Sequence, residues 1–384
     1  MRRRDLLRLL LAAPPVAWLQ PWMPPALGGA AVEDANAAAV YQKAFAWAET
    51  LRPEFRNRLR EAATRPIDGR IVEDLIRDAQ PALKAIREAD AIASCRWNSE
   101  VLLPEDLGKG RLSVWNDNVI RVACLSARRH ARLGQGREAV GELFASLTFA
   151  HRIGTGGVLF ARVLECNGEL AAFQTLGRIL LELDDASRAL LSRRLDALPP
   201  PEPASATIGP ESRFILASLR EKLNAAGPVI EGEHWDDFWL GKAEIVALKA
   251  LTGGDRVKFL AHLDATVPAF AELARRLDLP HPDCRAALDD FAKKEQSIHP
   301  IAASLVENVW SVRYMVDRMH AIRTMLFAGL ALIRDGEAAF RAISDPFGTG
   351  AFGLERGGKN GFLIRSGLVV ESKPEVSLQI GEPS

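Results

Sequence analysis

The stretch EGEHWDDFW, residues 231–239, places five potential metal ligands or acid–base groups and three aromatic rings within nine residues. The potential ligands are Glu231, Glu233, His234, Asp236 and Asp237. A metal site needs three or four ligands that converge at bonding distance. Neighbouring residues on a helix point in different directions, and only residues three or four apart share a face. This stretch would therefore need distant partners to complete a metal site.

The same stretch can also be the start of a helix. Asp236 and Asp237 then lie in the first turn, where carboxylates bind free backbone N–H groups and favour the positive end of the helix dipole. Trp235 and Trp239 are four residues apart and pack on one side. We favour the helix start, with the wall of a ligand groove as the alternative. The groove candidates are Glu233, His234, Trp235, Asp237 and Trp239.

Other chemical groups in the sequence are isolated. The run His281-Pro282-Asp283-Cys284 could supply metal ligands, but its aspartate is also a suitable N-cap for a helix. We interpret His130, His151 and His320 as surface or core histidines. The loop Gly154-Thr155-Gly156-Gly157 lacks the lysine of a phosphate loop, and no G-x-S-x-G motif of serine hydrolases occurs. No cofactor is expected, the metal content is left open, and enzymatic activity is undecided.

The charge balance argues against electrostatic partners. Lysine plus arginine equals aspartate plus glutamate, at 49 residues each. A chain without net charge has no general attraction for nucleic acid or an anionic membrane. Its 384 residues, 48% of them hydrophobic, are enough for a large buried core. We therefore expect a protein or cell-envelope component as the partner, and no nucleic acid. The oligomeric state is left open.

The N-terminus has the layout of a cleavable export signal. A basic start is followed by an apolar run from Leu6 to Leu19 and by small residues up to Ala31. The motif Arg3-Arg4-Asp5-Leu6-Leu7-Arg8 resembles the twin-arginine export motif, which implies folding before export; the general secretory route stays open. The apolar run is shorter than the about 20 residues of a membrane-spanning helix. We expect removal of residues 1–30, a periplasmic or cell-envelope location, and no integral membrane span.

The four cysteines follow no zinc or redox motif. Cys95, Cys124, Cys166 and Cys284 are widely spaced, and most lie among apolar residues in helical patterns. We favour buried thiols over disulfides.

Helical periodicity dominates residues 32 to about 343. We expect helices at about 36–51, 71–93 with a kink or break at Pro81, 112–133, 158–182, 186–198, 211–226, 235–251, 255–277, 283–294 and 300–334. Consecutive prolines at 199–205 cannot continue a helix, so we expect a linker there. The predicted domains are an N-terminal helical domain at 32–198 and a second helical bundle at 206–343.

The segment ACLSARRHARLGQGREAVGELFASLTFAH resembles a tetratricopeptide helical hairpin. Ala127 precedes a turn at residues 134–137, and Ala139, Leu143 and Ser146 follow at the small, large and small positions of that family. Small residues allow two antiparallel helices to approach closely. This resemblance covers about 30 residues and implies antiparallel helix pairs, in a bundle or a short α-solenoid.

Residues 344–384 change to a strand pattern. Asn360-Gly361 is a strong hairpin signal, because a type I′ turn needs positive φ at both central positions. We expect strands at about 351–356, 362–370 and 376–380, forming an antiparallel β-meander that docks on the helices, since so small a sheet is unstable alone. The export signal, helix pairs and closing DPF-G-x-G-x-F hairpin together resemble a group of uncharacterised bacterial exported helical proteins. That resemblance brings no known activity.

These observations predict a mainly α protein that acts as an exported scaffold or binding protein. Its ligand would lie in a groove between helix pairs, because stacked helix pairs form concave surfaces. The alternative is a metal-dependent hydrolase or lyase with Glu233, His234 and Asp237 in its site.

Overall fold

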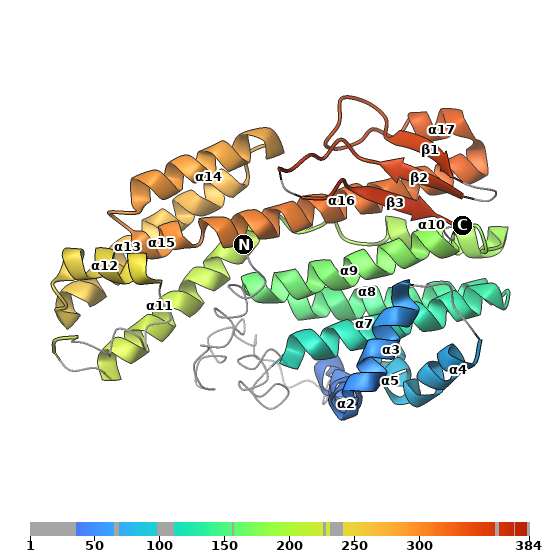
Figure 1. Cartoon of the computed structure of the whole chain (residues 1–384), viewed down its shortest axis with the longest axis horizontal. Helices are drawn as coiled ribbons and strands as arrows, with labels where there is room; N and C mark the ends of the chain where they lie inside the picture. Colours follow the sequence, from blue (N-terminus) through green and yellow to red (C-terminus); the bar gives the residue numbers. More distant parts are fainter. Residues whose placement is uncertain are drawn as a thin grey trace.

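The structure, a computed structural model, is mainly α-helical and ends in a small β-sheet (Figure 1). It describes residues 36–64, 69–97, 111–155, 157–225, 228–230, 241–357, 361–371 and 373–381. The predicted fold class, antiparallel helix pairs followed by a C-terminal antiparallel β-meander, is confirmed.

The first part of the described chain is built around a layer of long helices. Its helices are α2 (Ala37–Thr50), α3 (Pro53–Thr64), α4 (Gly69–Asp78), α5 (Gln80–Asp90), α7 (Arg111–Arg132), α8 (Gly136–Gly154), α9 (Leu159–Ile179) and α10 (Asp185–Asp196). Helices α7, α8 and α9 pack against one another, and α2 to α5 cover them from one side (Figure 1). Gly134 adopts a left-handed φ of 73° in the tight turn between α7 and α8, a conformation that glycine adopts without strain.

Small residues bring these long helices close together. Ala127 of α7 and Ala139 of α8 are fully buried. A Cβ on Gly168 of α9 would lie 2.8 Å from the Cβ of Ala150 on α8. The backbones of α8 and α9 therefore approach closely, which places polar side chains of one helix beside the other. The tetratricopeptide resemblance itself stays a prediction.

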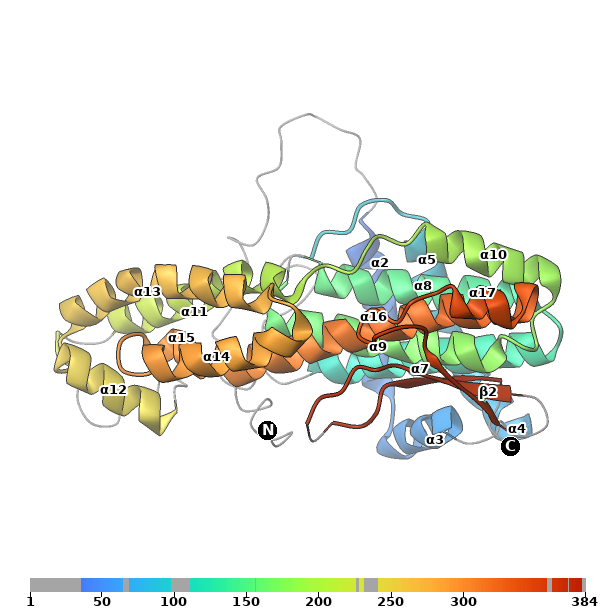
Figure 2. The same cartoon turned by 90° about the horizontal axis from the view of Figure 1, so that it is seen from above.

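The second part of the described chain is built around one long helix, α16. Its elements are the 3-10 turn η3 (Ala204–Thr207), α11 (Ile208–Ala225), α12 (Lys242–Thr252), α13 (Arg256–Leu277), α14 (His281–Glu295), α15 (Pro300–Ser304), α16 (Val306–Asp335) and α17 (Glu337–Arg341). Helix α16 has 30 residues and packs against α13 and α14 near its start and against α9 further along (Figures 1 and 2). The predicted division into two helical domains stays a prediction.

The C-terminal sheet is an antiparallel meander in the order β1-β2-β3. Its strands are β1 (Gly353–Gly357), β2 (Gly361–Arg365) and β3 (Ser377–Ile380), and Gly357 pairs with Gly361 across the first hairpin. Strand β3 packs on α9 and α16. A Cβ on Gly177 of α9 would lie 2.6 Å from the carbonyl oxygen of Gln379. The expected docking of the sheet on the helices is thus confirmed.

Several local expectations need correction. The helix expected at 300–334 is interrupted at Leu305, between α15 and α16. Helices α3 and α17 were not expected. Helix α3 begins at Pro53, because proline is well suited to the first turn of a helix.

Three of the cysteines are buried and Cys95 is partly buried, and all four are free thiols. Among the described helices, none has the length and apolar character that crossing a membrane requires.

Candidate functional site

One face of α9 carries charged side chains that are shielded from solvent. Arg162, Glu165 and Glu169 follow at spacings of three and four residues, so they share a face. Arg162 is 3% exposed, Glu165 is 1% exposed, and Glu169 is half-buried. Charged side chains are rarely this buried unless they are paired. We name these three residues, together with His151 of α8, the polar cluster.

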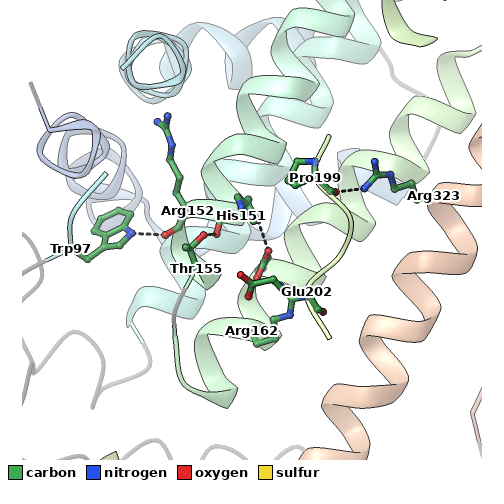
Figure 3. A network of polar contacts seen from close by, with 9 residues as sticks. Trp97, His151, Arg152, Thr155, Arg162, Pro199, Glu202 and Arg323 are labelled. Carbon is green, nitrogen blue, oxygen red and sulfur yellow. Dashed lines mark hydrogen bonds and ion pairs between the residues drawn. The ribbon is translucent and has the colours of Figure 1, made fainter. Parts of the chain in front are cut away.

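His151 and Arg162 both bind the Glu165 carboxylate. His151 Nδ1 lies 2.8 Å from Glu165 Oε1, and Arg162 Nη1 donates to Glu165 Oε2 at 2.5 Å. Figure 3 shows His151 and Arg162 reaching this region from different helices. The carboxylate is therefore held both from its own helix and from α8.

The end of α8 leaves room for this carboxylate because its last residue has no side chain. A Cβ on Gly154 would lie 1.8 Å from Glu165 Oε2 and 2.6 Å from Glu165 Cβ. Both distances are far below van der Waals contact. Gly154 thus allows Glu165 to lie against the backbone of α8. Gly154, the first residue of the glycine-containing loop at 154–157, therefore has a packing role.

The proline-rich segment after α10 is bound by two arginines. Arg162 Nη2 donates to the carbonyl oxygen of Glu202 at 2.6 Å. Arg323 of α16 donates to the carbonyl oxygen of Pro199 at 2.6 Å, and also to those of Leu195 and Leu198. Figure 3 shows Glu202 beside Arg162 and Pro199 beside Arg323. The segment is therefore fixed next to the polar cluster by donors from two helices.

Burial changes the acid–base properties of the polar cluster. It raises the pKa of Glu169 to about 8, an effect that the Glu165 carboxylate increases and that Arg162 and His151 oppose. The hydrogen bond to Glu165 raises the pKa of His151. The Glu169 side chain makes no hydrogen bond within the described part of the chain. A carboxyl group with such a pKa can donate a proton near neutral pH.

The polar cluster also contains a potential set of metal ligands. His151, Glu165 and Glu169 each offer one ligand atom, and these atoms lie within 4.8 Å of one another. The cluster can thus present one nitrogen and two oxygen donors to a cation.

The groove residues predicted from the sequence cannot be placed beside this cluster. Glu233, His234, Trp235, Asp237 and Trp239 lie outside the described residues, and α12 is described from Lys242. The helix-start and ligand-groove interpretations of residues 231–239 both stay predictions.

The potential ligands around His281 are not brought together. His281 is the first residue of α14, and its Nδ1 lies 2.7 Å from Asp317 Oδ2 on α16. Cys284 is fully buried, and burial raises the pKa of its thiol to about 11. The N-cap of α14 is Pro280, so the prediction that Asp283 caps this helix is wrong. Asp283 lies in the first turn instead.

The remaining histidines behave differently from one another. His130 Nδ1 lies 2.6 Å from Gln135 Oε1, and His320 packs edge-on against Phe347 with ring centroids 5.8 Å apart. His151 also has a partner, because its Nδ1 binds Glu165 Oε1 in the polar cluster. The interpretation of these residues as surface or hydrogen-bonded core histidines stays a prediction. The sequence did contain a signal for the polar cluster. Two carboxylates lie four residues apart on one expected helix, and the preceding helix carries a histidine.

Comparison of the chain with protein-family models, with curated proteins and with solved structures gave no match. A functional argument therefore starts from the geometry of the polar cluster.

Proposed function

We propose that this protein is an exported helical binding protein whose ligand site is the polar cluster. One observation carries the proposal: the cluster contains polar groups that no described residue satisfies. The half-buried side chain of Glu169 makes no hydrogen bond with the described residues, and Nε of the buried Arg162 has no partner among them. An unsatisfied buried polar group costs about 1–3 kcal/mol. A ligand that supplied the missing partners would offset this cost.

The other groups of the cluster support this proposal because they are held in place by rigid elements. Glu165 is bound by both His151 and Arg162. Arg162 is itself fixed by the Glu202 carbonyl. Side chains that lie on helices and are locked by neighbouring hydrogen bonds lose little entropy when a ligand binds.

Thermal unfolding with three small probes tests the proposal. Zinc chloride, spermidine and sodium succinate represent a divalent cation, a polyamine and a dicarboxylate. A bound probe at about 100 times its Kd stabilises the folded state by about 2.7 kcal/mol. We therefore expect at least one probe to raise the melting temperature by about 3 °C or more.

Two variants locate the binding. Glu169→Gln should abolish the increase in melting temperature. Glu202→Gln, which changes an exposed carboxylate in the adjacent segment, should retain it. The proposed function is wrong if no probe changes the melting temperature of the unmodified protein.

Export and partner remain part of the same proposal. The N-terminal pattern supports export, with a mature chain that begins near Ala31. The zero net charge supports a protein or cell-envelope component as the partner rather than nucleic acid. The intact mass of the protein recovered from the periplasm tests the cleavage.

A metal-dependent hydrolase or lyase is the second candidate. One observation favours it: His151, Glu165 and Glu169 offer three potential ligand atoms within 4.8 Å of one another. Three protein ligands leave a coordination position for a reacting water. A zinc-supplemented protein should then hydrolyse p-nitrophenyl acetate or phosphate faster than free zinc does, and Glu169→Gln should lose this activity. If the zinc-supplemented protein hydrolyses both substrates no faster than free zinc does, the protein is not a hydrolase for either of them.

A further inference from the structure

The polar cluster combines a histidine and two carboxylates in one small volume. We propose that it binds one divalent transition-metal ion through a ring nitrogen of His151 and carboxylate oxygens of Glu165 and Glu169. This inference rests on the proposed function, because it names the ligand of the same site.

The distances between the ligand atoms suit this assignment. All three lie within 4.8 Å of one another, and His151 Nδ1 is already 2.8 Å from Glu165 Oε1. Zinc–ligand bonds of about 2.1 Å in a tetrahedral arrangement place two ligand atoms about 3.4 Å apart. Metal binding would therefore need small movements of the side chains, with His151 Nδ1 and Glu165 Oε1 moving apart by about 0.6 Å. The Glu169 side chain can move at little cost, because it has no hydrogen bond with the described residues to break.

Arg162 provides the independent observation, because it is a buried side chain with an unused donor in the cluster. It is 3% exposed, binds Glu165 Oε2 through Nη1, and has no partner for Nε. Carboxylates that bind metals commonly keep such an outer hydrogen-bond partner. Three protein ligands leave a further coordination position open for water or an anion. A molecule held there and within reach of Arg162 Nε would satisfy this buried group.

The types of the donor atoms select the class of ion. Calcium and magnesium prefer ligand sets made of oxygen, whereas one imidazole nitrogen with two carboxylates suits zinc, manganese or iron(II). A thiolate does not contribute. Cys166 is adjacent to Glu165 in the sequence but does not belong to the group of potential ligand atoms that lie close together. Zinc is therefore a suitable probe.

When both carboxylates are ionised, the charges of the cluster also favour a dication. Two carboxylates at this separation repel each other when both are ionised, and the repulsion is strong away from bulk water. Arg162 offsets one of the two negative charges. An ion between the carboxylates would replace their repulsion with attraction to both.

Calorimetric titration of the purified protein with zinc chloride, in a buffer that does not chelate metals, tests the inference. We expect one equivalent of zinc to bind, confirmed by elemental analysis after dialysis. Glu169→Gln should lower the affinity at least about tenfold. Glu202→Gln removes an exposed carboxylate close to the cluster and should change the affinity by less than about twofold.

A spectroscopic measurement separates loss of a ligand from loss of the fold. Cobalt(II) bound in place of zinc has visible absorption bands that depend on its ligands, and His151→Gln should shift or abolish them while the circular dichroism spectrum stays unchanged. Unchanged cobalt bands in a folded His151→Gln variant would overturn the inference.

The possible results distinguish this inference from the proposed function. Equal zinc affinity of the unmodified protein and Glu169→Gln would overturn the inference, because zinc would then bind elsewhere. If zinc does not bind but spermidine or succinate stabilises the unmodified protein and not Glu169→Gln, the inference fails and the proposed function stands. If none of the three probes binds, both are wrong.

Discussion

At the scale of single residues, the polar cluster depends on the missing side chain of Gly154. A Cβ there would lie 1.8 Å from Glu165 Oε2, so Gly154→Ala must displace Glu165 from His151 and Arg162. Disrupting a buried ion pair is strongly destabilising. We expect Gly154→Ala to lower the free energy of unfolding by about 2–4 kcal/mol, measured by urea denaturation.

Another glycine of α8 provides the matched control for this substitution. A Cβ on Gly141 would meet no atom within 4 Å. Gly141→Ala should therefore raise the free energy of unfolding by about 0.5–1 kcal/mol, because alanine favours the helix. If both variants were stabilised, the close packing of Glu165 against α8 would be refuted.

The residue scale also shows why the cluster was not predicted. Glu165 and Glu169 are four residues apart on one helix, so their proximity follows from the sequence alone. His151 is 14 residues before Glu165, and its approach depends on how closely α8 and α9 pack. That packing depends on Gly154 and Gly168, whose close contacts only the three-dimensional structure reveals.

At the scale of elements, the N-terminus of α9 is capped from another helix. Glu211 of α11 accepts a hydrogen bond from the backbone N–H of Leu159 at 2.9 Å, and burial raises the pKa of Glu211 to about 7. An acid with a raised pKa in the folded state binds its proton more tightly there than in the unfolded state. Its contribution to stability is thus fully present below about pH 4.5 and is lost as the pH rises to about 7.

Glu211→Gln should remove this part of the pH dependence. Glutamine keeps an acceptor for Leu159 and carries no charge, so the variant should gain stability relative to the unmodified protein between pH 4.5 and pH 7. The gain should reach on the order of 3 kcal/mol at most. Urea denaturation at several pH values measures the difference. A difference that is the same at pH 4.5 and pH 8 would contradict a raised pKa of Glu211.

Most helices and strands were predictable from the sequence, because the spacing of apolar residues and the positions of prolines depend on local structure. Helix α13 was expected at 255–277 and is found at Arg256–Leu277, and α9 was expected at 158–182 and is found at Leu159–Ile179. Helix α3 was missed because its sequence has few apolar residues and begins with a proline that we interpreted only as the end of α2. Patterns that mark where one helix stops can thus hide the start of the next.

At the scale of the whole molecule, α16 joins parts of the chain that are distant in sequence. It packs against α9, α13 and α14, and strands β2 and β3 lie on it (Figure 1). Arg323, near its middle, reaches carbonyl groups more than 120 residues earlier in the chain. Such long-range contacts leave no periodic signal in the sequence, so neither this arrangement nor the position of the proline-rich segment could be predicted.

The contact between α16 and the proline-rich segment predicts a stability effect for Arg323. Arg323→Met keeps most of the apolar stem but leaves the carbonyl groups of Leu195, Leu198 and Pro199 without this donor. We expect the free energy of unfolding to fall by about 1–3 kcal/mol in urea denaturation. Arg334→Met, on the same helix, removes an exposed arginine that pairs with the neighbouring Asp335 and should change the free energy of unfolding by less than about 0.5 kcal/mol. Equal effects of the two substitutions would mean that the donor role of Arg323 contributes nothing to joining the two parts of the molecule.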